Sequence, residues 1–302
     1  MASYDFVTVN VFTDERFGGN PLAVLPDATG LTDAQMQAIA AEFNLSETTF
    51  VLPPDNPQHH ARVRIFSRKS EMPFAGHPNV GTGFVLATIA GDPPEHYTFE
   101  EIAGLVRVHI LRDANRQISG ARIAAPRSLS IDIGIPVEVV AGCASLSPDD
   151  IATLSHTPLV ASVGTPFVLA EVASVEALSR ARPDLSAFRS AADEFAGMDG
   201  RFALYLYAWM PGDERRIRAR MFAPLGGTPE DPATGSAAAT LAALLTSIAP
   251  GDNVDLSYAI EQGVEMGRPS LILASAVKTG EGPVSASVAG SCVPVSRGTL
   301  VV

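Results

Sequence analysis

The chain has 302 residues, of which 46% are hydrophobic and 18% charged, and its formal net charge is -12. This composition is typical of a globular protein with a sizeable core, and the acidic balance argues against extensive binding of a nucleic-acid backbone. The N-terminus lacks a basic region followed by an apolar one, and no apolar run reaches the roughly 18 residues of a membrane span, so we expect no membrane partner.

The first third of the chain alternates between strand and helix patterns. Runs rich in Val, Phe and Thr predict strands at residues 4–12, 22–26, 47–53 and 61–67. Between them, Thr32 followed by Gln35 is a capping pattern for a helix over residues 31–43. The segment 74–91 predicts a glycine-rich turn that runs into a helix of small residues.

The middle of the chain mixes strands and helices without regular alternation. Strands are predicted at residues 131–140, 157–174, 201–211 and 215–224, and helices at residues 147–155, 174–182 and 183–197. This irregular order favours an α+β fold over a doubly wound nucleotide-binding fold.

One pattern occurs twice in the sequence. The strand RVRIF (62–66) matches RARMF (218–222), and GHPNVGT (76–82) matches EDPATGS (230–236). In the second match, four pairs are each 154 residues apart: His77 with Asp231, Pro78 with Pro232, Gly81 with Gly235, and Thr82 with Ser236. We interpret this as an internal duplication that predicts two similar lobes.

The repeated motif has two interpretations. Asp231 and Pro232 fit the ordinary cap and first position of a helix, with no functional role. Alternatively, since a residue before proline is disfavoured in the α region, His77 and Asp231 lie just outside helices that start near Pro78 and Pro232. The free N–H groups of those first turns would then bind an anion, and both helix starts would face one cleft.

Glu47 is a third candidate, because it opens a strand of β-branched and apolar residues. It is either a solvent-facing strand end or an inward carboxylate whose pKa burial would raise, which suits a general base. No phosphate loop and no metal-ligand spacing occur, and the His59–His60 turn is expected to be solvated, so no metal or other cofactor is predicted.

The two cysteines, Cys143 and Cys292, are far apart and in no motif. A disulfide framework is therefore not expected, and the cytoplasm is the natural compartment.

Several motifs, in this order, resemble one family over nearly the whole chain. They are DERFGGNPLAVL (14–25), FNLSETTFV (43–51), FAGHPNVGTG (74–83), RMFAPLGGTPEDPATGSA (220–237) and QGVEMGRPS (262–270). The chain resembles the phenazine-biosynthesis PhzF-like isomerases, which have the diaminopimelate-epimerase-like fold. The resemblance implies an α+β fold of two pseudo-symmetric lobes, each a curled, mostly antiparallel sheet around a central helix. It also implies a homodimer without cofactors. The lobes are expected at residues 1–125 with the last strand 288–302, and at residues 126–287.

The resemblance also implies site residues. Glu47 corresponds to the family's base, and His77 and Asp231 to its catalytic partners. Substrate contacts are implied for the following residues: Asn20, Gly76, Pro78, Asn79, Gly235, Ser236, Gly263 and Arg268. For Arg268, an interlobe salt bridge is the alternative.

The activity implied is an isomerisation, in which Glu47 moves a proton within a small amino or hydroxy carboxylic acid. The family's best-known substrate is trans-2,3-dihydro-3-hydroxyanthranilic acid. The epimerases of this fold use two cysteines at the helix starts, and neither Cys143 nor Cys292 lies there, so chemistry with two thiols is excluded. Two alternatives stay open: an epimerase or racemase with opposing bases, and a protein that binds small acids without turnover.

Overall fold

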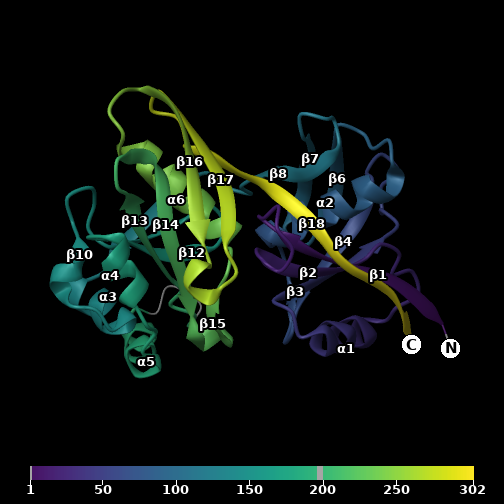
Figure 1. The fold of residues 1–302 in the computed structure, drawn as a ribbon, viewed down its shortest axis with the longest axis horizontal. Helices are drawn as coiled ribbons and strands as arrows, with labels where there is room; N and C mark the ends of the chain where they lie inside the picture. The colour runs from purple at the N-terminus through teal and green to yellow at the C-terminus, as the bar shows by residue number, and fades with distance from the viewer. Residues whose placement is uncertain (1, 196–199) are drawn as a thin grey trace. The chain divides into compact units, whose positions relative to one another are not determined.

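The computed structural model describes residues 2–195 and 200–302, which form two compact units (Figure 1). Unit 1 comprises residues 1–126 and 288–302, and unit 2 comprises residues 127–287.

The elements of unit 1 are these: β1 (Ser3–Val11), β2 (Asn20–Leu25), α1 (Asp33–Phe43), β3 (Glu47–Leu52), β4 (Ala61–Ser67), β5 (Glu71–Met72), α2 (Gly76–Ala90), β6 (His96–Glu101), β7 (Gly104–Arg112) and β8 (Ile118–Ala124). The elements of unit 2 are these: β9 (Ser130–Gly134), α3 (Val137–Ala144), η1 (Pro148–Asp150), β10 (Ile151–Ala152), β11 (Leu159–Ser162), β12 (Pro166–Val172), α4 (Val175–Arg180), α5 (Leu185–Glu194), β13 (Leu204–Met210), β14 (Asp213–Ala223), η2 (Pro224–Gly226), β15 (Thr228–Asp231), α6 (Gly235–Ile248), β16 (Asn253–Gln262), η3 (Val264–Met266) and β17 (Ser270–Thr279). The last strand, β18 (Ser285–Val301), begins in unit 2 and continues into unit 1.

In unit 1 the sheet curls until it closes around α2. Strand β1 pairs with β2 and β18, and the ring continues through β8, β7, β6, β4 and β3 back to β2. Figure 1 shows β18 alongside β1 near the two chain ends. The central helix can lie so close to the strands because it carries glycines. A Cβ on Gly81 would come within 2.5 Å of the Leu22 side chain, and a Cβ on Gly83 within 2.5 Å of Val108.

Unit 2 repeats the same order of strand pairing. In unit 1, β2 and β3 are parallel, β3 and β4 antiparallel, β4 and β6 parallel, and β6 and β7 antiparallel. In unit 2, the same sequence of pairings joins β12, β13, β14, β16 and β17. The buried helix α6 follows the short strand β15 and precedes β16, just as α2 follows the short strand β5 and precedes β6 in unit 1. The two units are therefore pseudo-symmetric.

The same ion pair precedes the central helix in each unit. In unit 1, Arg64 on β4 binds Glu71 on β5 through two bonds of 2.7 Å, and its guanidinium lies over the Phe66 ring. In unit 2, Arg220 on β14 binds Glu230 on β15 through two bonds of 2.8 Å, and its guanidinium lies over Phe222. Each planar guanidinium thus fixes a short strand that leads into a helix.

Most of the strands and helices predicted in the first third are present, but two predictions in unit 2 are wrong. The strand predicted over residues 131–140 ends at Gly134, and α3 begins at Val137 after Ile135 and Pro136, since proline suits the start of a helix. The helix predicted over residues 147–155 is a single 3-10 turn followed by β10, because Ile151 and Ala152 pair with β12. The helix predicted over residues 183–197 is α5, and residues 196 and 197 lie outside the described part.

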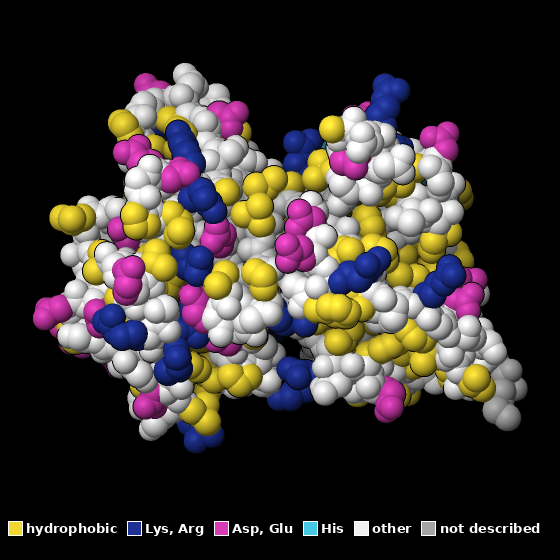
Figure 2. Space-filling model, viewed as in Figure 1, with side chains coloured by type: hydrophobic (Ala, Val, Ile, Leu, Met, Phe, Trp, Pro, Cys, Tyr) yellow, Lys and Arg dark blue, Asp and Glu magenta, His cyan; other side chains and the backbone are white. Residues whose placement is uncertain are grey.

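None of the described helices combines the length and the apolar character that crossing a bilayer requires. On the face in view in Figure 2, Lys and Arg side chains are interspersed with Asp and Glu rather than gathered in one patch.

Candidate active site

Glu47 and His77 meet in unit 1. Glu47 is the first residue of β3, opposite Leu22 in the parallel pairing with β2. Its Oε2 lies 3.2 Å from Nε2 of His77, and the two side chains are only 16% and 7% exposed. Glu47 is therefore the inward carboxylate of the two alternatives, and the structure places it against the first turn of α2.

The residues around this pair are fixed by short-range polar contacts. Asn20, the fully buried first residue of β2, accepts a 3.3 Å hydrogen bond from the hydroxyl of Ser46, which directly precedes Glu47. On the next turn of the helix, the hydroxyls of Thr49 and Thr82 are 2.8 Å apart and join β3 to α2. The backbone on both sides of the Glu47–His77 contact is thus held in place.

His77 is neutral at physiological pH. Burial lowers the pKa of its imidazole from 6.5 to about 3, because the charged form would lose its hydration. The neutral ring has one donor and one acceptor nitrogen. His77 can therefore donate a hydrogen bond to a carboxylate, or accept one from a carboxylic acid, without carrying charge.

Helix α2 starts close to Pro78 as predicted, although His77 lies inside it rather than just outside, and α6 starts three residues after Pro232, which leaves Asp231 outside it as expected. Helix α2 begins at Gly76, so His77 and Pro78 lie inside its first turn, where proline is tolerated because N–H groups have no acceptor within the helix. Asp231 is the last residue of β15, paired with Met221, and α6 begins only at Gly235. Of the two interpretations, the one in which Asp231 and Pro232 are the cap and first position of a helix is therefore wrong, because the sheet retains Asp231 and other contacts hold the turn that follows it.

Gln262 is the centre of those contacts in unit 2. This fully buried residue donates from Nε2 to the Asp231 carbonyl at 2.8 Å and to the Thr234 hydroxyl at 3.1 Å. Its Oε1 accepts from the Thr234 N–H at 3.1 Å and from the Tyr205 hydroxyl at 3.2 Å. The Thr234 hydroxyl in turn donates to Oδ2 of Asp231 at 2.6 Å. The carboxyl of Asp231 is thus oriented by a buried network.

Gly263 lies against the same turn. Its φ of +74° belongs to the left-handed region, and a Cβ there would come within 2.6 Å of the Pro232 carbonyl oxygen. Ser270 donates to that carbonyl at 2.9 Å. The same Cβ would also come within 2.5 Å of the Arg268 carbonyl oxygen. The Arg268 side chain is half-buried, and this burial lowers the pKa of its guanidinium. Glycine is therefore required where the 263–268 turn approaches Pro232.

Neither central helix has a side-chain N-cap. The cap of α2 is Ala75, which offers no oxygen, and the cap of α6 is Thr234, whose hydroxyl is used by Asp231. Neither helix start is therefore capped by a side chain, and N–H groups at a helix start of this kind suit an anion such as a carboxylate.

The remaining predicted site residues divide between the units. Asn20, Gly76, Pro78 and Asn79 lie in unit 1 with Glu47 and His77, whereas Gly235, Ser236, Gly263 and Arg268 lie in unit 2 with Asp231. Gly76, Pro78, Asn79, Gly235 and Gly263 are buried, while Ser236 and Arg268 are half-buried. The Asn79 amide donates to the Ala75 carbonyl at 3.0 Å, so it is engaged within the protein.

Sequence reasoning missed Gln262, Tyr205 and Ser270 as parts of the site. Gln262 stands next to Gly263 in a quoted motif, but nothing in a single sequence indicates that its amide reaches back to Asp231.

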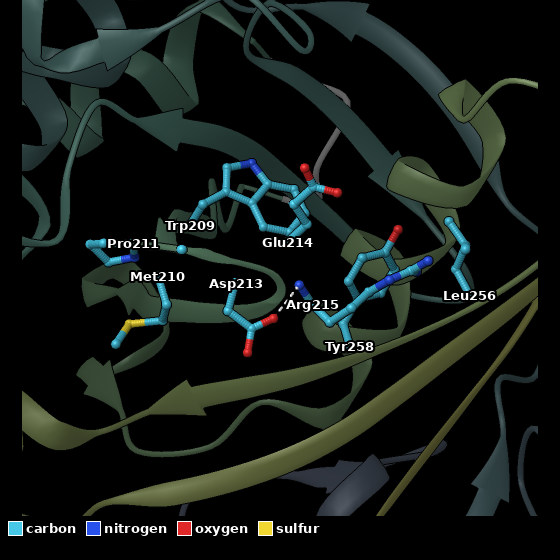
Figure 3. A pocket seen from close by; sticks show the side chains of 9 residues that line it. Trp209, Met210, Pro211, Asp213, Glu214, Arg215, Leu256 and Tyr258 are labelled. Carbon is cyan, nitrogen blue, oxygen red and sulfur yellow. Dashed lines mark hydrogen bonds between the residues drawn. The ribbon is translucent and has the colours of Figure 1, made fainter.

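A hollow of about 710 Å³ opens on unit 2, away from these residues (Figure 3). Trp209, Tyr258 and Arg215 line it, together with the exposed hairpin between β13 and β14. None of the predicted site residues lines it, so it is a separate surface feature.

Within residues 2–195 and 200–302, no group of three or more His, Cys, Asp or Glu side chains is arranged to hold a metal. Both cysteines are buried, and burial raises the pKa of Cys143 to about 12 and also raises that of Cys292. Cys143 lies on α3 and Cys292 on β18, so neither belongs to the first turn of a central helix.

Comparisons with known proteins agree with this architecture. The model of the phenazine biosynthesis-like protein family matches residues 9–298. An uncharacterized isomerase of Mesorhizobium japonicum is 41% identical over 313 aligned residues, which cover 100% of both chains. The trans-2,3-dihydro-3-hydroxyanthranilate isomerase of Pseudomonas fluorescens is 36% identical over 301 aligned residues, which cover 99% of both chains.

A solved structure shows the same fold. The PhzF-family phenazine biosynthesis protein of Bacillus anthracis superimposes with a TM-score of 0.87 over 100% of both chains, at 24% identity. With this fold, the family match and the named relatives, the chain belongs to the phenazine-biosynthesis PhzF-like family of isomerases.

Proposed function

We propose that the chain moves a proton between two carbons of a small carboxylic acid that bears an amino or hydroxyl group, with Glu47 as the acid and base. The observation that carries this proposal is the contact of 3.2 Å between the Glu47 carboxyl and the neutral His77 imidazole. A carboxylate that is largely removed from water and backed by an uncharged donor or acceptor suits the abstraction of a weakly acidic C–H proton.

The proposed steps use Glu47, its neighbour His77 and the start of α2. Glu47 takes the proton from one carbon of a conjugated substrate and returns it at another carbon on the same side. His77 orients Glu47 and exchanges a hydrogen bond with it as the carboxyl changes its protonation state. The uncapped N–H groups at the start of α2 bind the substrate carboxylate or stabilise negative charge that develops in the transition state.

For Asp231 we propose a supporting role in orienting or protonating a polar group of the substrate. The support is its match to His77 in the internal repeat and the buried network around Gln262, which fixes the carboxyl. Since Glu47, His77 and Asp231 suffice for acid–base chemistry, the proposed reaction uses neither a metal nor an organic cofactor.

The substrate class is argued from chemistry and from one relative. Uncapped helix N-termini suit a carboxylate, and the Pseudomonas fluorescens relative is named for an isomerisation of trans-2,3-dihydro-3-hydroxyanthranilate. That compound is the first to test, followed by cyclic and aromatic amino and hydroxy acids. The homodimer and the cytoplasmic location stay predictions, the first of which light scattering on the purified protein tests.

The test is proton NMR of these acids with the purified protein in D2O. We expect loss of a C–H signal at one carbon and appearance of deuterium at another, and loss of both with Glu47→Gln. Exchange with inversion at a single stereocentre would instead identify an epimerase. Binding without any exchange would identify a non-catalytic acid-binding protein, and either result would overturn the isomerase proposal.

A further inference from the structure

Four of the six histidine side chains have a polar partner within the protein, and all six lie in the described part of the chain. The partners are the Glu100 carboxylate for His59, the Thr98 N–H for His60, the Glu47 carboxyl for His77, and the Thr157 carbonyl and Tyr207 hydroxyl for His156. His96 and His109 are the two whose rings have no hydrogen-bond partner among residues 2–195 and 200–302.

His96 and His109 lie directly opposite each other on the antiparallel strands β6 and β7. The Ile110 N–H donates to the Glu95 carbonyl at 3.0 Å, which makes His96 and His109 a non-hydrogen-bonded pair, the kind in which facing side chains come closest. The centres of the two imidazole rings are 5.4 Å apart, and their planes are tilted by 41°.

This pair lies on the outer face of the unit 1 sheet. The neighbouring Tyr97 and Val108 are buried, and the Val108 side chain lies against Gly83 of α2. Because successive side chains of a strand point to opposite faces, His96 and His109 project away from α2. Both are only half-buried, so dissolved ions have access to the rings.

Two imidazoles at this separation suit one metal ion. A metal held at about 2.1 Å by one nitrogen of each ring lies about 3 Å from both ring centres, so centres 5.4 Å apart correspond to a nearly tetrahedral angle at the metal. Burial, and next to it the charge of Arg122, lowers the pKa of His109, which keeps this ring in the neutral form that binds metal. Imidazole nitrogens select Cu²⁺, Ni²⁺ and Zn²⁺ over the oxygen-seeking Mg²⁺ and Ca²⁺.

A third ring nearby is not ready to bind the same ion. The centre of the His60 ring is 6.3 Å from that of His96, but Nδ1 of His60 accepts a hydrogen bond of 3.0 Å from the Thr98 N–H. In the neutral ring the other nitrogen then carries the hydrogen and has no lone pair to offer. This agrees with the lack of any three-ligand group within the described residues.

The charges around the pair act in both directions. Arg122, opposite His109 on β8, and Arg107 on β7 are exposed and oppose the binding of a cation. The carboxylate of Glu95, which is also exposed, favours it. Exposed charges are screened by water and salt, so they adjust the affinity without excluding the ion.

We propose that His96 and His109 form a bidentate site for a divalent late transition metal, with water completing the coordination. The ion would join β6 to β7 on the face opposite α2, apart from the contact between Glu47 and His77. It should stabilise the folded protein, because the fold brings the two rings together and the unfolded chain does not. The site does not depend on the proposed function.

Calorimetric titration of the metal-free, full-length protein with CuCl2, NiCl2, ZnCl2 and MgCl2 tests the site. We expect Cu²⁺ to bind more tightly than Ni²⁺ or Zn²⁺, and Mg²⁺ not to bind. His96→Gln and His109→Gln should each weaken Cu²⁺ binding by at least about tenfold, since each removes a ligand. His59→Gln is the matched control, because the Glu100 carboxylate already engages that ring, and it should leave the affinity unchanged.

Thermal melts give a second readout. Zn²⁺ should raise the melting temperature of the wild type but not that of the double variant His96→Gln/His109→Gln, while the two proteins should melt alike without metal. Equal Cu²⁺ affinity in the wild type and the double variant would overturn the proposal. A loss of affinity in His59→Gln as large as in His96→Gln, or an equal rise in melting temperature in both proteins, would also overturn it, because the metal would then lie elsewhere.

Discussion

Replacement of His77 by Gln should change how the stability of the protein depends on pH. Below pH 6.5 the unfolded chain binds a proton at His77, while the folded protein does not until the pH falls to about 3. His77 therefore makes the wild type progressively less stable as the pH falls through this window. Glutamine keeps a polar amide near the position of Nε2 but has no titratable group.

The size of the effect follows from the shift in pKa. Each pH unit within the window corresponds to about 1.4 kcal/mol of unfolding free energy, because one extra proton is bound by the unfolded state. Since the unfolded His77 is only half protonated at pH 6.5, the wild type should lose about 2 kcal/mol through this side chain between pH 6.5 and 4.5. The Gln variant should be spared that loss, whatever its stability at pH 7.

Urea unfolding of both proteins at half-unit steps from pH 4.5 to 8 measures the effect. Glu101→Gln is the comparison variant, because burial raises the pKa of Glu101 to about 8. The contribution of Glu101 to the unfolding free energy therefore has the opposite pH dependence, and stability is lost as the pH rises from about 4.5 to about 8. Parallel stability curves for wild type and His77→Gln below pH 6.5 would refute the conclusion that His77 is buried and neutral.

Three further outcomes follow from the structure. Gly263→Ala should destabilise the protein by more than about 2 kcal/mol and lower turnover, because its φ is +74° and its Cβ would come within 2.6 Å of the Pro232 carbonyl oxygen. The control is Gly267→Ala, where φ is +70° but no atom lies close to the added Cβ, and it should cost only about 1 kcal/mol in thermal melts. Gln262→Leu leaves the Tyr205 hydroxyl and the Thr234 N–H buried without their acceptor, and should destabilise by about 3 kcal/mol in urea unfolding, whereas an unchanged midpoint would contradict the network. Dialysis against EDTA should leave the rate of C–H exchange unchanged, and loss that one added metal restores would contradict the proposed chemistry.

The local patterns of the sequence predicted much of the fold. Runs rich in Val, Phe and Thr predicted β1, β3 and β4, and the Thr32–Gln35 pattern predicted α1, whose capping box is present. The internal repeat agrees with the pseudo-symmetry of the two units, because matched strands precede matched helices. These features are decided by neighbouring residues, so a single sequence contains them.

Features that depend on distant contacts were not predictable in the same way. The start of α6 at Gly235 is set by pairing of Asp231 with β14 and by Gln262, which lies 31 residues further along the chain. The pairs Arg64–Glu71 and Arg220–Glu230 fall at the same place in each repeat, but only the sheet shows that they meet.

For the candidate site, the sequence identified Glu47 and His77 separately, through strand composition and the repeat, and the structure brings these two together. The Asn79 amide donates to the Ala75 carbonyl, and its expected contact with substrate stays a prediction. The groups that fix Asp231 were invisible because Gln262 and Tyr205 are far from it in sequence.

The central claim is that Glu47 transfers the proton, and C–H exchange in D2O with wild type and Glu47→Gln tests it most directly. Glutamine keeps the size of the side chain but cannot accept a proton, so exchange should fall by at least 10²–10⁴-fold, as is typical for loss of a general base, while melting temperature and acid binding change little. Equal exchange rates in the two proteins would contradict the account.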